Sequence, residues 1–325
     1  MISVIVPSRN RGELIDEFLK CIQKQTLNNS SFEVLIIDNG STDNTQEIVE
    51  KHKKDSFIDI KYFYEDKPGL HNGRHFGLKM SSGNILVFAD DDVLPNPKWL
   101  QSIHESFLRS DVMMVGGDNI PNFEEHPPRW LKTLWEKKDK NNIQSIWMLS
   151  IINFNKNEIC EIHPSQIWGC NFSIRRSVLN ETMGFHPDGM PDHQILLRGD
   201  GECYVTNYVA KKNYKCLYHP DAHVRHLVSK NRMTFNYIRK RGFNEGISAS
   251  YSDLRNAYDT ISQMQNIKKI IRLNIEKLKF IFLDKDIKHM YKCFNEGYKE
   301  AYLLHQNSYK TDTSLRNWVH KKNYL

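Results

Sequence analysis

The sequence lacks several features that would place it outside ordinary globular proteins. Its six cysteines include no CxxC pair, which argues against a disulfide framework and against a zinc site built on paired cysteines. No apolar run approaches the about 18 residues of a membrane-spanning helix. The opening residues, MISVIVPSRN, lack the basic region and cleavage site of a secretion signal. We therefore expect a soluble, cytoplasmic protein with reduced, mostly buried thiols.

Length and charge indicate a folded chain whose two parts meet different partners. The 325 residues are 39% hydrophobic and 26% charged, which suffices for one full core or two modest ones. Residues 1–226 carry 26 Lys and Arg against 30 Asp and Glu, whereas 227–325 carry 19 against 9. The first part is thus net acidic and the second strongly basic.

Short apolar segments alternate with amphipathic ones at the start of the chain. We expect strands at 2–6, 32–37, 58–64 and 84–88, each followed by a polar loop and then, for the first three, a helix. This alternation predicts an α/β fold, with a Rossmann-like, mostly parallel sheet flanked by helices. Such sheets bind ligands beyond the carboxyl ends of their strands, which is where the polar loops lie.

The pattern changes after the fourth strand. Residues 120–165 are rich in proline and tryptophan without a regular period, and we interpret them as a partly ordered insertion on the substrate side. Regular structure is expected again as strands at 168–174 and 215–218 and a helix at 202–212. Beyond residue 230 the chain looks helical, and 267–282 has an apolar stripe opposite several lysines.

Three consecutive aspartates, Asp90, Asp91 and Asp92, end the fourth predicted strand. Adjacent carboxylates repel one another, so placing them at a buried strand end is costly unless a cation compensates. A hard divalent ion such as Mg²⁺ or Mn²⁺ prefers oxygen ligands of this kind and takes others from substrate phosphates. The alternative is a solvated acidic turn that caps the next helix.

Eight segments, taken in order, resemble glycosyltransferase family 2, whose members are inverting, nucleotide-sugar-dependent enzymes of GT-A fold. They are VIVPSRN at 4–10, IIDNGSTD at 36–43, the loop at 69–77, FADDDV at 88–93, WGCNFSIRR at 168–176, MGF at 183–185, GDGE at 199–202 and PDAHVRH at 220–226. The resemblance implies a GT-A catalytic domain at 1–228, with a nucleotide-sugar-binding half at 1–118 and an acceptor-side half at 119–228. Residues 229–325 would form a basic helical C-terminal extension.

The resemblance also implies roles at the nucleotide. Pro7, Ser8 and Arg9 would border the base and ribose, and Asp38 would accept a hydrogen bond from the base. An ordinary turn is the alternative for the first three. Asp43 is more simply a helix cap.

At the diphosphate, an arginine fork suits phosphate oxygens, so Arg74 would lie there, unless it forms a surface salt bridge. Asp90 would approach the ribose and Asp92 would bind the metal. The role of Asp91 is ambiguous between the two. His226 would join the metal, with His223 as a substitute, although a lone histidine after a strand is more often structural.

The segment GDGEC departs from the family's Gly-Glu-Asp, in which the aspartate is the general base. If Glu202 takes the place of the family's glutamate, then Cys203 takes that of the base, and a thiol of ordinary pKa is a poor base. We therefore expect Asp200 or Glu202 to serve and favour Asp200. Trp168 is either a surface on which an acceptor sugar stacks or a core residue.

These features predict an inverting glycosyltransferase that uses Mn²⁺ or Mg²⁺ and a nucleotide diphosphate sugar, with a UDP-sugar favoured. The acceptor would be a saccharide or lipid-linked saccharide hydroxyl, in bacterial polysaccharide or glycolipid assembly. A sugar nucleotidyltransferase and a non-catalytic nucleotide- or saccharide-binding module are the alternatives. The basic extension either packs on the catalytic domain or makes peripheral contact with the inner face of the cytoplasmic membrane. We expect no nucleic-acid partner, because the basic residues are spread over several helices.

Overall fold

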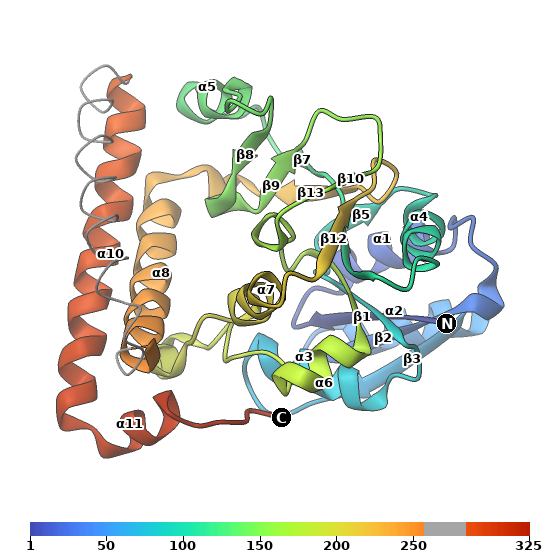
Figure 1. The fold of residues 1–325 in the computed structure, drawn as a ribbon, viewed down its shortest axis with the longest axis horizontal. Coiled ribbons are helices and arrows are strands. Elements are labelled where there is room, and N and C mark those ends of the chain that lie inside the picture. Colours follow the sequence, from blue (N-terminus) through green and yellow to red (C-terminus); the bar gives the residue numbers. More distant parts are fainter. Residues whose placement is uncertain (257–283) are drawn as a thin grey trace.

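The computed structural model describes residues 1–256 and 284–325, and a large mixed sheet lies at its centre (Figure 1). The sheet has eight strands in the order β10-β12-β6-β11-β4-β1-β2-β3. They are β1 (Ile2–Ser8), β2 (Phe32–Asp38), β3 (Asp59–Tyr64), β4 (Ile85–Ala89), β6 (Val112–Gly116), β10 (Cys160–Glu161), β11 (Asn171–Arg175) and β12 (Lys215–Tyr218). Strands β3, β2, β1 and β4 run parallel, and β11 is antiparallel to β4 and β6. The predicted α/β fold and the first four strands are confirmed.

Helices cover both faces of this sheet, because its strands bury side chains on both sides. One face packs against α1 (Gly12–Ile22), α2 (Thr45–Asp55) and α4 (Trp99–Phe107). The other packs against α3 (Leu70–Met80), α6 (Arg176–Thr182) and α7 (Glu202–Lys211). In strand β1 successive side chains point to opposite faces of the sheet. Val4 and Val6 belong to the core on the first face, and Ile5 belongs to the core on the second.

A second sheet takes three of its five strands, β7, β8 and β9, from the stretch that we expected to be irregular. Its order is β5-β13-β7-β9-β8, and its strands are β5 (Val93–Pro95), β7 (Asn119–Phe123), β8 (Gln144–Ile146), β9 (Ile151–Asn153) and β13 (Val224–Val228). The insertion is therefore more ordered than predicted. Three of the strands have only three residues, and β7 pairs with β13 about a hundred positions away, so no local period signals them. Helix α5 (Arg129–Glu136) completes this part, with Trp130 buried against Phe235.

The C-terminal part is helical, as predicted, with α8 (Phe235–Asn256), α10 (Lys285–Thr311) and α11 (Thr313–Val319). Helices α8 and α10 lie side by side (Figure 1). They approach closely because Gly242, Gly246 and Gly297 have no side chain at the contact. The predicted helix at 267–282 lies outside the described residues. Within the two described ranges, none of the helices has the length and apolar character required to span a membrane.

The end of the chain packs on the part of the structure that holds the large sheet. The Trp318 indole donates to the carbonyl of Leu197 at 2.7 Å, and the hydroxyls of Tyr251 and Tyr324 are 2.8 Å apart. The ring Nδ1 of His75, on α3, lies 3.1 Å from the Tyr324 carbonyl. These contacts tie α8, α11 and the last residues to the large sheet, which is the packing arrangement that we weighed against membrane contact.

We predict that Gly246→Ala destabilises the chain, because a Cβ there collides with the carbonyl oxygen of Tyr298 on α10. Overpacking of this kind costs about 1–3 kcal/mol. Urea unfolding followed by circular dichroism measures the change, with Asn236→Ala, an exposed site on the same helix, as control. Equal stability of both variants would show that α8 and α10 do not need this close approach.

Candidate functional site

A cleft of about 820 Å³ opens where β1 and β4 end. Most of the predicted site residues line it, namely Pro7, Ser8, Arg9, Arg74, Asp90, Asp91, Asp92, Asp200 and Glu202. Asp38 and His226 do not line it, although His226 lies directly behind Asp92. The strand ends thus gather segments that are almost two hundred residues apart in the chain, as the parallel sheet predicts.

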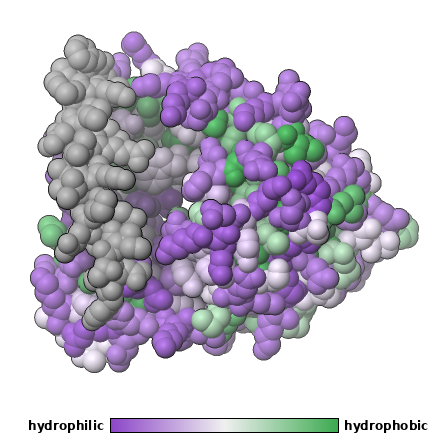
Figure 2. Space-filling view, in the orientation of Figure 1, coloured by the Kyte–Doolittle hydropathy of each residue, from purple (hydrophilic) through white to green (hydrophobic). Residues whose placement is uncertain are grey.

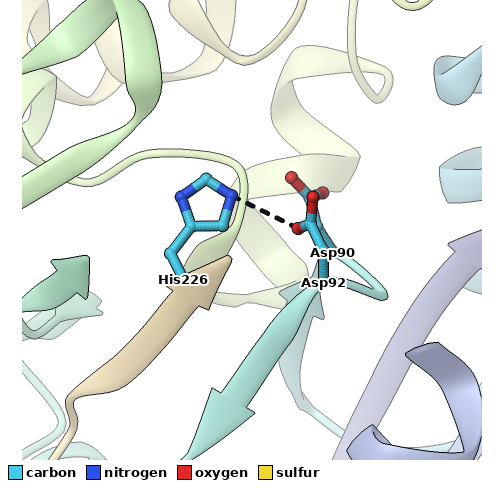
Figure 3. A group of neighbouring side chains, drawn as sticks. All are labelled: Asp90, Asp92 and His226. Atoms are coloured by element: carbon cyan, nitrogen blue, oxygen red, sulfur yellow. Dashed lines mark ion pairs between the residues drawn. The ribbon is translucent and has the colours of Figure 1, made fainter. Parts of the chain in front are cut away.

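Asp90, Asp92 and His226 form a compact trio (Figure 3). One ligand atom from each lies within 4.8 Å of the other two. The backbone explains the meeting, because Asp92 precedes β5 and the register of β5 with β13 places Val93 opposite His226. The sequence therefore brings a histidine to the acidic triplet through a short antiparallel pair.

The donor set of this trio fits a divalent cation. Oδ1 of Asp92 is buried without a hydrogen-bond donor and lies 3.2 Å from Nε2 of His226. With its proton on Nδ1, which lies 3.3 Å from the Ser150 carbonyl, the imidazole turns a lone pair toward that oxygen. This 3.2 Å separation between Oδ1 and Nε2 allows both atoms to bind the same ion at bond lengths of about 2.1 Å. Arg232 adds positive charge beside the trio, because its Nη1 lies 3.3 Å from Oδ2 of Asp92.

Burial and charge set the protonation of the triplet. Burial raises the pKa of Asp90, and the nearby Asp92 carboxylate raises it further. Burial also opposes ionisation of Asp92, but His226 in the form that carries a proton on Nε2, together with Arg232 and Arg11, brings the pKa of Asp92 below its usual value. Asp92 therefore remains a carboxylate, the form that binds a cation.

Asp91 has a different position. Its oxygens accept from the Ser8 hydroxyl at 2.7 Å and from Arg11 at 2.6 Å, and its side chain is 3% exposed. Burial raises the pKa of Asp91 to about 6 despite the Arg11 charge. Asp91 thus ties the loop after β1 to the end of β4. We did not predict Arg11, although it is the basic residue that directly follows the turn.

The predicted substitute for His226 lies elsewhere. His223 has Nε2 3.0 Å from the Asn96 amide nitrogen and Nδ1 2.9 Å from the Pro220 carbonyl. Both ring nitrogens are therefore engaged in the loop before β13, and neither faces the trio.

Arg74 is buried between two acidic groups of the cleft. It lies 3.8 Å from Asp90 and 3.4 Å from Glu202. The other oxygen of Glu202 accepts from the backbone of Gly169 at 3.3 Å. Glu202 therefore connects the start of α7 to Arg74 and to the segment before β11, and both its oxygens are engaged in positioning the cleft wall.

Asp200 is held by two elements that sequence reasoning did not connect with it. His186 Nδ1 lies 2.5 Å from one carboxylate oxygen, and the Ser252 hydroxyl of α8 donates to the other at 3.0 Å. His186 is itself fixed by stacking on Tyr204, with ring centroids 3.7 Å apart. Next to them, Cys203 has an accessible surface in the cleft wall, but the protein atoms packed around it and then the Glu202 and Asp200 carboxylates raise the pKa of Cys203, so its thiol stays protonated.

Asp188 is a further carboxylate of the cleft that sequence reasoning missed. It pairs with Arg198 at 2.7 Å and accepts from the backbone of Gly189. Burial opposes its ionisation, but Arg198 and Arg74 bring the pKa of Asp188 below its usual value. The only signal in the sequence was its place in a turn-rich stretch between two predicted motifs.

Three other predicted residues have simple structural partners. Asp38 is buried and accepts from the Tyr62 hydroxyl at 2.6 Å and the Ser41 backbone at 2.7 Å, while the adjacent Asn39 lines the cleft. Base recognition by Asp38 stays a prediction. Asp43 accepts from the backbone nitrogens of Gly12 and Thr45, at the starts of α1 and α2. Trp168 packs partly buried against the core.

All six cysteines are free. Only Cys170 and Cys216 are buried, so the expectation of mostly buried thiols was wrong. The others lie on the helices α1, α7 and α10 and in the edge strand β10, at positions that local hydrophobicity does not distinguish from the core.

Helix α8 forms one wall of the cleft. Its cleft-lining residues are Tyr237, Arg241, Glu245, Ser248, Ala249 and Ser252. Their spacing of three and four places them on one face of the helix. The cleft is therefore shared between residues 1–228 and the basic extension, which the sequence did not indicate.

Comparison with known proteins agrees with this architecture. The sequence profile described as glycosyl transferase family 2 matches residues 3–183. The chain is 36% identical over 118 residues to glycosyltransferase AglE of Haloferax volcanii, which covers 36% of this chain and 38% of AglE. It is 30% identical over 135 residues to the poly(ribitol-phosphate) β-N-acetylglucosaminyltransferase TarS of Staphylococcus aureus, which covers 39% of this chain and 24% of TarS. The matches thus span well under half of these relatives.

Solved structures show the same fold. The mannosyltransferase PcManGT of Pyrobaculum calidifontis, in complex with GDP-Man and Mn²⁺, superimposes with a TM-score of 0.53 and 17% identity, covering 99% of this chain and 83% of PcManGT. Residues 1–349 of S. aureus TarS with UDP-GlcNAc give a TM-score of 0.50 and 14% identity, covering 95% and 91%.

The architecture is that of a GT-A glycosyltransferase, an α/β enzyme class with its substrate cleft at the strand ends. The chain belongs to glycosyl transferase family 2, whose profile matches more than half of it.

Proposed function

We propose that this chain is a metal-dependent, inverting glycosyltransferase that moves a sugar from a nucleoside diphosphate sugar to a saccharide hydroxyl. The observation that carries the proposal is the trio of Asp90, Asp92 and His226, which lies beside the buried Arg74 in the cleft. Complexes of neighbours with GDP-Man and with UDP-GlcNAc support a nucleotide-sugar donor. A UDP-sugar remains our favoured donor.

The cleft residues divide between nucleotide and diphosphate. Pro7, Ser8 and Arg9 follow β1 and would border the nucleoside, with Asp91 holding that loop in place. Asp92 and His226, with Asp90, would hold Mn²⁺ or Mg²⁺, which when bound neutralises charge on the diphosphate. The Arg74 fork would donate to the diphosphate oxygens as they gain negative charge on leaving.

Asp200 is the better candidate for the general base. Both carboxylates line the cleft and both have each oxygen engaged, but Glu202 is paired with Arg74, the group proposed for the diphosphate, and with Gly169, whereas Asp200 is oriented by His186 and Ser252. The acceptor hydroxyl would lose its proton to Asp200 as its oxygen bonds to the anomeric carbon. The bond from that carbon to the diphosphate oxygen breaks on the opposite face, and the nucleoside diphosphate leaves with the electron pair. This displacement inverts the anomeric centre.

A binding module of the same fold is the second candidate, because Cys203 stands where the family's base is expected. Its protonated thiol cannot take the acceptor proton. The two candidates differ in one measurement, the release of UDP from a UDP-sugar when Mn²⁺ and saccharide acceptors are added. Binding without release across a wide acceptor panel would favour the module.

We expect Asp92→Asn to weaken Mn²⁺-dependent UDP binding by at least about tenfold, because an amide oxygen is a weaker ligand than a carboxylate. Isothermal titration with UDP, with and without Mn²⁺, measures the loss. Asp221→Asn, which removes a partly exposed carboxylate close to His226 in sequence, is the control and should leave the affinity unchanged. An unchanged affinity in Asp92→Asn would rule out the proposed metal site.

We expect Asp200→Asn to lower kcat by about 10² to 10⁴, the usual range for a general base, with little change in the KM for the donor. Steady-state kinetics of UDP release provide both constants. The matched control is Asp192→Asn, whose side chain is 81% exposed and pairs with Lys240. Full activity of Asp200→Asn would shift the base to Glu202 or Asp188.

We further propose that the protein acts at the cytoplasmic face of a membrane, on a lipid-linked or polymeric saccharide acceptor. The support is the basic extension, with exposed lysines at 285, 292, 299 and 310 of α10. Figure 2 shows that hydrophilic residues cover most of the visible described face. The contact would therefore be electrostatic and peripheral, through attraction to anionic headgroups.

Vesicle sedimentation tests this contact with the full chain. We expect binding to vesicles containing phosphatidylserine, no binding to pure phosphatidylcholine vesicles, and release at high salt. The double variant Lys292→Glu and Lys299→Glu should bind less, whereas Lys53→Glu and Lys54→Glu on α2 should bind normally. Equal behaviour of the two double variants would contradict a membrane role for α10.

A further inference from the structure

The cleft wall formed by α8 contains one arginine that no described residue engages in an ion pair or a hydrogen bond. Ser252 donates to Asp200, and Ser248 accepts from Arg198 at 3.1 Å and donates to the Gly199 carbonyl at 2.7 Å. Arg241, on the same face of the helix, makes no ion pair or hydrogen bond with any described residue. Its Nε is buried and unsatisfied. A buried donor without an acceptor is costly, which indicates that a ligand supplies the acceptor.

Arg74 and Arg232 of the cleft also have a buried, unsatisfied Nε, so the feature that distinguishes Arg241 is the missing ion pair. Four of the six pair with carboxylates, as Arg11 with Asp91, Arg74 with Glu202, Arg198 with Asp188 and Arg232 with Asp92. The two without an ion pair are Arg9 and Arg241. Arg9 follows β1 on the proposed nucleotide side, so its charge is available to the donor. Arg241 comes from α8, the wall that also positions Asp200.

Two carboxylates lie near Arg241 without binding it. Glu245 is one helical turn further along α8, and its carboxylate makes no ion pair with Arg241. Asp188 is engaged by Arg198 at 2.7 Å, and Arg241 affects it only through its charge. The guanidinium instead lies over the ring of Trp147, with Cζ 5.9 Å from the ring centroid.

Trp147 lies beside Arg241 and adds an exposed aromatic surface, although it is not one of the residues that line the cleft. Its side chain is 43% exposed, and its ring is fixed edge to face against Phe294 of α10 at 5.4 Å. An aromatic ring with an open surface offers a place for the apolar face of a sugar, and a guanidinium beside it offers paired donors to an acidic substituent. Neither group is needed by the donor, whose diphosphate is already assigned to the metal trio and Arg74.

We infer that Arg241 and Trp147 form an acceptor subsite that selects a saccharide or polyol chain carrying an anionic group. The shared chemistry is an oxyanion that accepts two parallel N–H donors from the guanidinium. A hexuronate carboxylate and a phosphodiester both satisfy it. The inference rests on the proposed function, because it assigns the acceptor of that same cleft.

The experiment titrates three acceptor analogues into the 325-residue chain loaded with UDP and Mn²⁺. A hyaluronan tetrasaccharide carries carboxylates, a glycerol phosphate tetramer carries phosphodiesters, and chitotetraose is neutral. At low salt we expect at least one acidic probe to bind at least about tenfold more tightly than chitotetraose, since hydrogen bonds between charged groups supply this much. The preference should shrink at high salt, and the probe that shows it identifies the carboxylate or the phosphate as the source.

Variants assign the preference to Arg241. Arg241→Gln should abolish the preference for the acidic probe over chitotetraose, and Arg241→Lys should retain part of that preference. Arg239→Gln is the matched control, because it removes the same charge from α8 at a residue that pairs with Glu300 of α10 and lies outside the cleft. Thermal unfolding of each variant checks that the fold is intact.

Four outcomes would overturn the inference: equal binding of acidic and neutral probes, no binding of either acidic probe, equal losses in Arg241→Gln and Arg239→Gln, or weaker UDP binding in Arg241→Gln. The last outcome would place Arg241 at the donor diphosphate instead. UDP binding by the unaltered protein, measured separately, shows whether the proposed donor site itself is correct.

Discussion

The structure of the cleft depends on how three consecutive carboxylates are accommodated where β4 ends. Each has its own partner: Arg74 lies near Asp90, Ser8 and Arg11 bind Asp91, and His226 and Arg232 approach Asp92. These partners come from α3, the loop after β1, β13 and the turn before α8. Because burying an uncompensated carboxylate is costly, the triplet requires all of these segments to converge. The same requirement shapes the cleft, since the converging segments are its walls.

The repeated strand and helix pattern made the first half of the chain predictable from sequence. The strands there are short and largely apolar, and each polar loop follows a strand end, so local periodicity sufficed to place Ser8, Arg74 and the acidic triplet at one edge. The second sheet was not predictable in this way. Its short strands owe their stability to partners distant in sequence, as β7 does to β13, and they carry no period of their own.

The site residues that sequence reasoning missed share a physical reason. His186, Asp188 and Ser252 stand in no motif, and each becomes part of the site only because another segment packs beside it. Ser252 illustrates this best, because its hydroxyl reaches Asp200 only if α8 lies against the start of α7. The sequence identified α8 as part of a basic extension by its charge, but charge does not reveal which face of a helix is turned inward.

The packing of α8 therefore has a functional consequence beyond stability. The glycines at 242, 246 and 297 let α10 approach α8 closely, and the last residues bind Tyr251 on α8 and His75 on α3. These contacts fix the helix from two sides, so the position of Ser252 follows from the packing of the whole C-terminal part. If Asp200 is the base, its orientation depends on residues more than fifty positions later in the chain. A change in the α8 and α10 contact should then alter turnover before it alters donor binding, because the nucleotide-binding loops depend on the large sheet instead.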